Sequence, residues 1–231
     1  AVHSMKDVPA EQPKGLTIAA VPERAPPNDA LVSRSLSKLR DLPEGATVGT
    51  SSPRRIAELL RARPDLKALP IRGNVDTRIR KLDAGSYDAI ILAEAGITRL
   101  SMQNRIVERL PIEHFTPAPG QGLLAVVARG DRKDVLRVLE PVNDPKSWAE
   151  AVAERAFMNG VGGGCKIPLG AFAQVHGETL RLLGSVITPD GTRRIDVNDE
   201  GNVRSADAVG RAAAHKILEM GAGEIVKSWR A

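Results

Sequence analysis

Two strand–loop–helix units in the first half of the chain constrain the fold most strongly. Residues 47–50 predict a strand that leads into a helix, with Ser52 as N-cap and Pro53 at the first helical position. Residues 69–71 predict a second short strand, and apolar residues at 75, 79 and 82 mark one face of the helix that follows. Strands that alternate with helices predict a mostly parallel α/β sheet.

The rest of the chain continues this alternation and then changes character. Further strands are predicted at 17–21, 87–93 and 123–128, with Pro-rich connecting segments at 24–28 and 116–122. The last third predicts a helix over 145–158, strands at 170–175, 179–186 and 193–197, and a final helix that starts near Ser205 and ends at Gly221. This part therefore predicts a C-terminal α+β domain with a small antiparallel sheet.

The positive charge of the chain is concentrated in one stretch. The formal net charge is +5, and residues 51–83 hold nine basic and four acidic side chains, so this stretch alone accounts for it. Two of the arginines, Arg54 and Arg55, open a helix, where the helix dipole favours acidic residues by roughly 0.3–1 kcal/mol each. Either these residues form a solvated helix face, or an anion such as a carboxylate or phosphate completes a binding site.

A lone cysteine ends a run of glycines. Cys165 follows Gly162–Gly164 and precedes Lys166, and no second cysteine exists for an intramolecular disulfide. The thiol is either packed as a small apolar group or used chemically, since a neighbouring lysine favours the thiolate. One cysteine and no export signal favour a reducing, cytoplasmic setting.

Other features restrict the possible functions. The longest apolar runs are far too short to cross a bilayer, and an aromatic content of 3% argues against a base-stacking nucleic-acid surface. The histidines and the cysteine show no metal-ligand spacing, and no phosphate-binding glycine motif is present. Asp7, beside Lys6 at the end of a predicted strand, is a candidate general acid/base, although such a carboxylate is more often a turn or ion-pair residue.

Taken together, the segments resemble the porphobilinogen deaminase (hydroxymethylbilane synthase) family. The matching stretches follow the family's order along nearly the whole chain: residues 2–9, 49–55, 72–78, 87–93, 119–122, 153–157 and 163–170. The resemblance implies two lobes like those of periplasmic binding proteins and a third, C-terminal domain. In this sequence they correspond to 1–23 with 122–142 (an incomplete first lobe), 27–117, and 145–231.

The resemblance also implies a transferase of tetrapyrrole biosynthesis. Four porphobilinogen molecules lose ammonia and join head to tail on a dipyrromethane cofactor, and water releases hydroxymethylbilane. Cys165 matches the residue that holds the cofactor through a thioether, and Asp7 matches the catalytic aspartate. The residues that match the binding site for the carboxylates of the cofactor and the growing chain are Ser4, Lys6, Thr50, Ser51, Ser52, Arg54, Arg55, Arg72, Arg78 and Gln121. The family implies a monomer in the cytoplasm, with porphobilinogen as small-molecule substrate and no metal, nucleic acid or membrane partner.

The sequence departs from the family pattern at a few places. Pro53 replaces an expected Leu, and Val161-Gly162 replaces the usual Leu-Glu before the cysteine loop. The chain starts without Met at Ala1, and we expect a further stretch of the first lobe before it. Two alternatives to the enzyme therefore remain: a non-catalytic two-lobed binding module for small carboxylates, and an inactive fragment of the enzyme.

Overall fold

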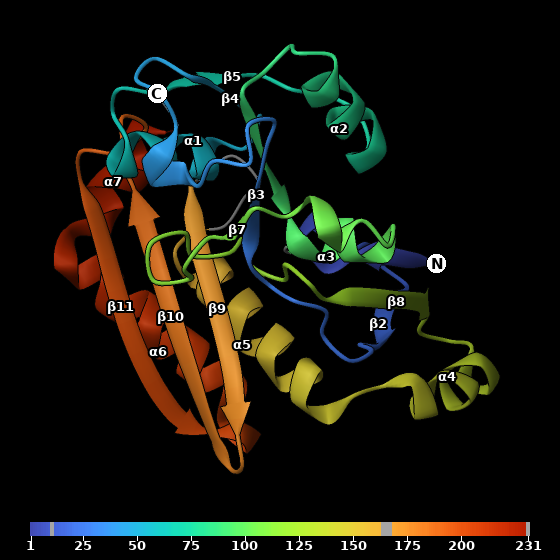
Figure 1. Cartoon of the computed structure of the whole chain (residues 1–231). Coiled ribbons are helices and arrows are strands. Elements are labelled where there is room, and N and C mark those ends of the chain that lie inside the picture. The colour runs from blue at the N-terminus through green and yellow to red at the C-terminus, as the bar shows by residue number, and fades with distance from the viewer. Residues whose placement is uncertain (10–11, 163–167, 230–231) are drawn as a thin grey trace.

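The computed structural model describes residues 1–9, 12–162 and 168–229, which form three sheets with flanking helices (Figure 1). The central sheet has five strands in the order β5-β4-β6-β3-β7. They are β3 (Asp29–Ser33), β4 (Thr47–Gly49), β5 (Lys67–Leu69), β6 (Ala89–Ala93) and β7 (Glu108–Arg109). We call this sheet and its helices the second lobe.

The central sheet is mixed, so the prediction of a mostly parallel sheet is wrong. Strand β4 pairs in parallel with β5 and β6, whereas β3 pairs antiparallel with β6 and β7. Strand β3 was not predicted, because it directly follows a Pro-rich segment. The chain enters the lobe through that segment and runs opposite to its neighbours.

Helices cover both faces of the central sheet. They are α1 (Pro53–Ala62), α2 (Val75–Asp83) and α3 (Glu94–Arg99). Leu59 of α1 packs on one face, while Ile79 of α2 and Ile97 of α3 pack on the other. A strand covered on both faces is apolar throughout, which explains the uninterrupted run in β6. The predicted start of α1 is confirmed, since the Ser52 hydroxyl accepts the amide of Arg55 at 3.4 Å.

A smaller antiparallel sheet, which we call the first lobe, lies beside the second lobe (Figure 1). Its strands, in the order β1-β8-β2, are β1 (Val2–Ser4), β8 (Leu124–Arg129) and β2 (Leu16–Ala20). The chain continues from β8 into α4 (Lys133–Leu139). Met5, Val21 and Leu123 form its core together with Ala151 of the C-terminal unit.

The C-terminal unit confirms the predicted α+β domain with an antiparallel meander, and with it the overall α/β class. Its elements are α5 (Pro145–Gly160), β9 (Leu169–His176), β10 (Thr179–Ile187), β11 (Arg194–Asn202), α6 (Ala206–Ile217) and α7 (Gly223–Ser228). Helices α5 and α6 pack on one face of the sheet around Phe157 (Figure 1). The predicted stop at Gly221 is confirmed: this residue has φ +95°, outside the helical range, and it separates the end of the preceding helix from α7.

Two segments without strand or helix join the lobes. We call residues 21–28 the first connector and residues 111–123 the second connector. Arg24 donates to Glu154 of α5 at 2.6 Å and to the carbonyl of Gln121 at 2.9 Å, so one side chain links both connectors to the C-terminal unit. In the described ranges, no helix is long and apolar enough to span a membrane.

Candidate functional site

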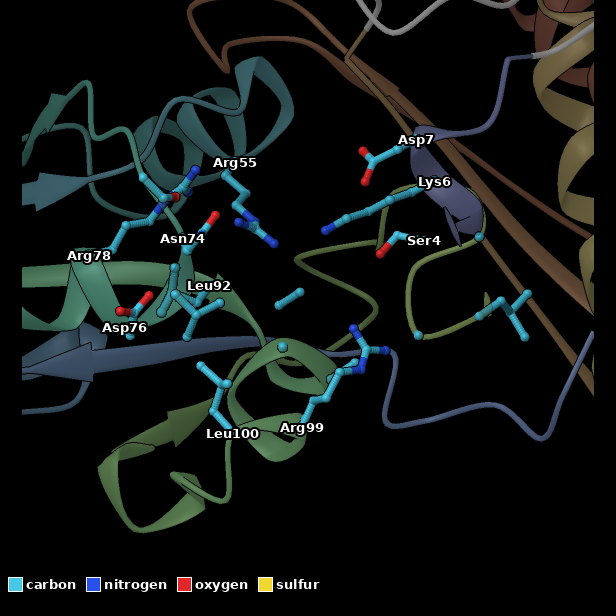
Figure 2. A pocket seen from close by; sticks show the side chains of 18 residues that line it. Ser4, Lys6, Asp7, Arg55, Asn74, Asp76, Arg78, Leu92, Arg99 and Leu100 are labelled. Carbon is cyan, nitrogen blue, oxygen red and sulfur yellow. The ribbon is translucent and has the colours of Figure 1, made fainter. Parts of the chain in front are cut away.

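A cavity of about 520 Å³ opens where the strands of the second lobe end and the first lobe faces them. Strands β4, β5 and β6 are parallel, so their carboxyl ends meet at one edge of the sheet, and ligands bind at such edges. Its polar side chains are Ser4, Lys6 and Asp7 from the first lobe, and Arg55, Asn74, Asp76, Arg78 and Arg99 from the second (Figure 2).

Lys6 and Asp7 enter the cavity from a 3₁₀ turn, Met5–Asp7, that follows β1. Buried Met5 anchors this turn in the core of the first lobe. Figure 2 shows the Lys6 side chain extending toward Arg55, with Asp7 beside it. Burial, and then the charge of Arg55, lower the pKa of Lys6 to about 8. An anion between these two cations would raise the pKa of Lys6 again.

Three cations that line the cavity lack an ion-pair partner within the described part of the chain. Lys6, Arg78 and Arg99 form no ion pair with any residue that the structure describes. Arg78 is held by its Nε, which donates to the Gly73 carbonyl at 2.7 Å, and burial lowers its pKa. Since unpaired cations in a half-enclosed space favour an anionic ligand, the cavity suits a molecule with several carboxylates.

Arg54 and Arg55 are held by a carboxylate of the protein itself. Asp29, the first residue of β3, is fully buried and accepts from Arg54 Nη2 at 2.7 Å and from Arg55 Nη2 at 2.7 Å. The two guanidinium groups hold the pKa of Asp29 well below its usual range. Gln121 completes the cluster by donating to Asp29 at 2.9 Å. The anion expected at this helix start is therefore, in large part, Asp29.

Arg54 also pairs with a buried glutamate one turn along α1. Its Nη1 donates to Glu58 Oε2 at 2.7 Å and to the Thr116 carbonyl of the second connector at 2.7 Å. Burial raises the pKa of Glu58 to about 8, against the opposing charge of Arg54. The buried face of α1 is thus largely charged, and of the apolar residues Ile56, Leu59 and Leu60 only Leu59 is fully buried.

The structure gathers only part of the predicted site around the cavity. Ser4, Lys6, Asp7, Arg55 and Arg78 line it. The remaining described candidates lie outside its lining: Thr50, Ser51, Ser52, Arg54, Arg72 and Gln121.

Those outlying residues have other roles in the structure. The Ser51 hydroxyl bonds both backbone polar groups of Ile71 and so fixes the loop between β4 and α1 to the next one. Arg54 and Gln121 are buried in the Asp29 cluster, while Arg72 is exposed. Cys165 lies outside the described residues.

Sequence reasoning missed two residues of this region. Arg99 lines the cavity from the end of α3, the third helix that follows a strand of the central sheet. The strand–loop–helix pattern found in residues 47–83 recurs in this unit. An arginine at the end of a helix is common, however, and does not by itself predict a binding residue. Asp29 follows a Pro-rich segment, where a polar residue predicts a turn rather than a buried anchor. Within the described residues, no group of three or more metal-ligating side chains is present.

Comparisons with known proteins identify the family of this chain. The family model "Porphobilinogen deaminase, dipyromethane cofactor binding domain" matches residues 1–137, and "Porphobilinogen deaminase, C-terminal domain" matches residues 148–219. The porphobilinogen deaminase of Pelotomaculum thermopropionicum is 47% identical over 230 residues, which are 100% of this chain and 74% of that protein. That of Thermus thermophilus is 46% identical over 231 residues, 100% of this chain and 77% of that protein.

Among solved structures, a putative methionine-binding lipoprotein of Bacillus subtilis is 15% identical, covering 55% of this chain and 61% of that chain with a TM-score of 0.41. The two family models together cover most of the sequence, and the relatives match it from end to end. The resemblance read from the sequence motifs is thereby confirmed, and the chain belongs to the porphobilinogen deaminase family.

Proposed function

We propose that this chain is a transferase of tetrapyrrole biosynthesis that joins four porphobilinogen molecules head to tail into hydroxymethylbilane. The observation that carries the proposal is the cavity in which Lys6, Arg78 and Arg99 have no ion-pair partner among the described residues and Asp7 faces them. Each porphobilinogen carries an acetate and a propionate, so the growing product is a polyanion that requires several cations. Family membership supplies the reaction.

The cavity also fits the dipyrromethane cofactor of the family. A dipyrromethane carries four carboxylates, and four cationic side chains line the cavity: Lys6, Arg55, Arg78 and Arg99. Its volume of about 520 Å³ lies within the range of small-molecule sites, roughly 300–1,000 Å³. The cofactor supplies the pyrrole on which the chain is built. We assign its thioether attachment to Cys165, on the family resemblance alone.

In this assignment Asp7 is the catalytic residue. At each step the C–N bond of porphobilinogen breaks with loss of ammonia, a new C–C bond forms to the pyrrole of the chain, and that pyrrole carbon loses its proton. A carboxylate in the cavity can accept this proton and stabilise the positive charge of the intermediate. Figure 2 shows Asp7 at the wall that faces Arg55. The cationic side chains hold the carboxylates of the substrate and thereby position the reacting carbon, a contribution that can amount to several kcal/mol.

The remaining predicted residues act around this centre. We propose that Ser4 and Arg55 contact carboxylates directly, since both line the cavity. Thr50, Ser51, Ser52 and Gln121 shape its wall through backbone contacts and the Asp29 cluster. Arg54 acts through that cluster as well, and Arg72 remains a contact implied by the resemblance.

We infer three domains with the ranges predicted from the sequence: 1–23 with 122–142, 27–117, and 145–231. In support, every strand of each sheet falls within one of these ranges. The family relationship further supports a monomer that works in the cytoplasm without nucleic acid, membrane or metal.

Mass spectrometry of the intact protein tests the proposal. After incubation with porphobilinogen, the full chain should gain the mass of a dipyrromethane and react with Ehrlich's reagent, and Cys165→Ser should gain neither. Asp7→Ala should keep the fold and the cofactor but stop elongation. A protein that keeps its bare mass, with Cys165 still open to alkylation, would favour the binding module or the inactive fragment.

A further inference from the structure

Arg194 joins the C-terminal unit to the second connector through one guanidinium group. It is the first residue of β11, and its side chain is only 3% exposed. Nη1 donates to the His114 carbonyl at 2.5 Å, and Nη2 donates to the Glu113 carbonyl at 2.7 Å and to the Thr116 hydroxyl at 2.9 Å. Nε is held by Asp196 of the same strand at 2.8 Å. Every nitrogen of the guanidinium is thus engaged, and three of the bonds cross to the connector.

The bonds of Arg194 continue to the wall of the cavity. Thr116, which Arg194 binds through its hydroxyl, accepts Arg54 Nη1 at its carbonyl at 2.7 Å. Arg54 shares Asp29 with Arg55, the member of this cluster that lines the cavity. A series of hydrogen bonds therefore runs from β11 to the ligand site, part-buried between Arg194 and Thr116 and buried from Thr116 onward. Such buried, charge-assisted bonds hold their partners in one geometry, because breaking any of them leaves a desolvated polar group.

A second contact brings the same hairpin against α1. Gly191, in the turn between β10 and β11, has φ +74°, and a Cβ added there would lie 2.4 Å from the Ala57 carbonyl and 2.8 Å from the Arg61 amide nitrogen. The turn therefore packs directly on the backbone of α1. The β10–β11 hairpin holds this helix at two places: at its middle through Gly191, and at its first turn through Arg194, Thr116 and Arg54.

We propose that Arg194 is a positioning residue that keeps the C-terminal unit, whose sequence includes Cys165, in register with the Arg55 wall of the cavity. The proposal rests on the proposed function: a cofactor attached to the C-terminal unit must place its carboxylates against the cavity wall of the second lobe, so the relative position of the two units matters. Arginine suits this role because its planar fork reaches several acceptors at once, whereas a lysine offers a single point charge.

Kinetics and hydrogen exchange of the full chain separate positioning from simple stabilisation. In Arg194→Ala we expect amide exchange in residues 116–123 to rise about tenfold, while the amides of β10 stay protected. The KM for porphobilinogen should rise about tenfold with kcat changed less than threefold, because a small displacement of a binding wall costs on this scale. Arg194→Lys should fall between wild type and Ala. Arg181→Ala is the matched control, since Arg181 lies on the same sheet in an exposed pair with Glu200.

The outcomes are distinct. The proposal is overturned if Arg194→Ala matches the Arg181→Ala control both in the KM and in the amide exchange of the second connector. It is also overturned if exchange rises uniformly across the C-terminal unit. If Arg194→Ala fails to fold, Arg194→Lys decides by the same two measurements, and wild-type values for both overturn it. Amide exchange is measured on protein without cofactor, so it tests the coupling between Arg194 and the second connector even if the proposed function fails. A wild-type protein that never loads dipyrromethane refutes the proposed function alone.

Discussion

Replacing Asp29 by Asn should cost this protein a large share of its stability, although the two side chains have the same shape. Asp29 is fully buried and accepts four hydrogen bonds, at 2.7–3.0 Å, from Arg54, Arg55 and Gln121. The amide of Asn would turn its NH₂ group toward the N–H donors of these side chains. It would also leave the two buried guanidinium groups without the negative charge of the carboxylate. Removal of one partner from a buried ion pair typically costs 3–5 kcal/mol, so we expect the free energy of unfolding to fall by about 3–5 kcal/mol.

Urea-induced unfolding at pH 7 measures this loss, with Asp131→Asn as the control. Asp131 pairs with Arg129 in the same two-pronged way, but both side chains are more than half exposed. Exposed pairs contribute about 0–1 kcal/mol, so the control should hardly differ from wild type. The depressed pKa of Asp29 means that its contribution is present at neutral pH and is lost only as the pH falls below about 4. A loss below about 1 kcal/mol in Asp29→Asn would refute the role of this carboxylate as the anchor of both arginines.

Three further predictions concern individual charges. Burial raises the pKa of Glu58 from 4.5 to about 8, so its contribution to stability is full at pH 4 and declines by at most about 5 kcal/mol as the pH rises toward 9. Urea unfolding of Glu58→Gln should not show this decline. The control Glu200→Gln, at an exposed position, should still show it. Because the pKa of Lys6 is lowered to about 8, binding of porphobilinogen near pH 8 should raise this pKa and take up a fraction of a proton. Calorimetry in buffers of different ionisation enthalpy detects the uptake, and Lys6→Met should abolish it. Arg99→Leu should raise the KM for porphobilinogen about tenfold. It should leave the unfolding midpoint unchanged, because Arg99 is exposed and has no ion-pair partner among the described residues. An unchanged KM would show that Arg99 does not belong to the site.

Much of the architecture could be predicted from local signals. The cap at Ser52 and Pro53, the apolar spacing of α2 and the strands around β10 depend on neighbouring residues, and the structure confirms all three. Strand β3 could not be found in this way. Its position between β6 and β7 depends on pairing with residues more than fifty positions away, and its first residue is a buried aspartate that local rules assign to a turn.

The sequence predicted the kind of side chain around the cavity better than it predicted which residues line it. Basic residues at strand ends predicted an anion site, and cationic side chains do line the cavity at that edge of the sheet. The sequence alone could not show which arginines the protein neutralises internally. Arg54 and Arg55 are adjacent in one helical turn, yet only Arg55 reaches the cavity, because Glu58 and Thr116 hold Arg54 on the other side. That difference depends on the carboxylates and carbonyls that the tertiary fold brings to α1.

The two connectors also determine how the lobes can move. Their backbones meet where the Ala25 amide donates to the Gly122 carbonyl at 3.0 Å. The backbones touch there: Gly122 has φ +87°, and an added Cβ would lie 2.4 Å from the Ala25 carbonyl oxygen. Two further bonds join the connectors beside this point: the Arg24 guanidinium donates to the Gln121 carbonyl at 2.9 Å, and the Gln121 amide donates to the Pro27 carbonyl at 2.7 Å. These hydrogen bonds between the connectors lie at residues 24–27 and 121–122, and we expect the lobes to rotate about this short region rather than slide along it. We therefore expect space for a lengthening product to come from a change of angle between the lobes, with Gly120 and Leu123, which line the cavity next to this region, remaining at its edge.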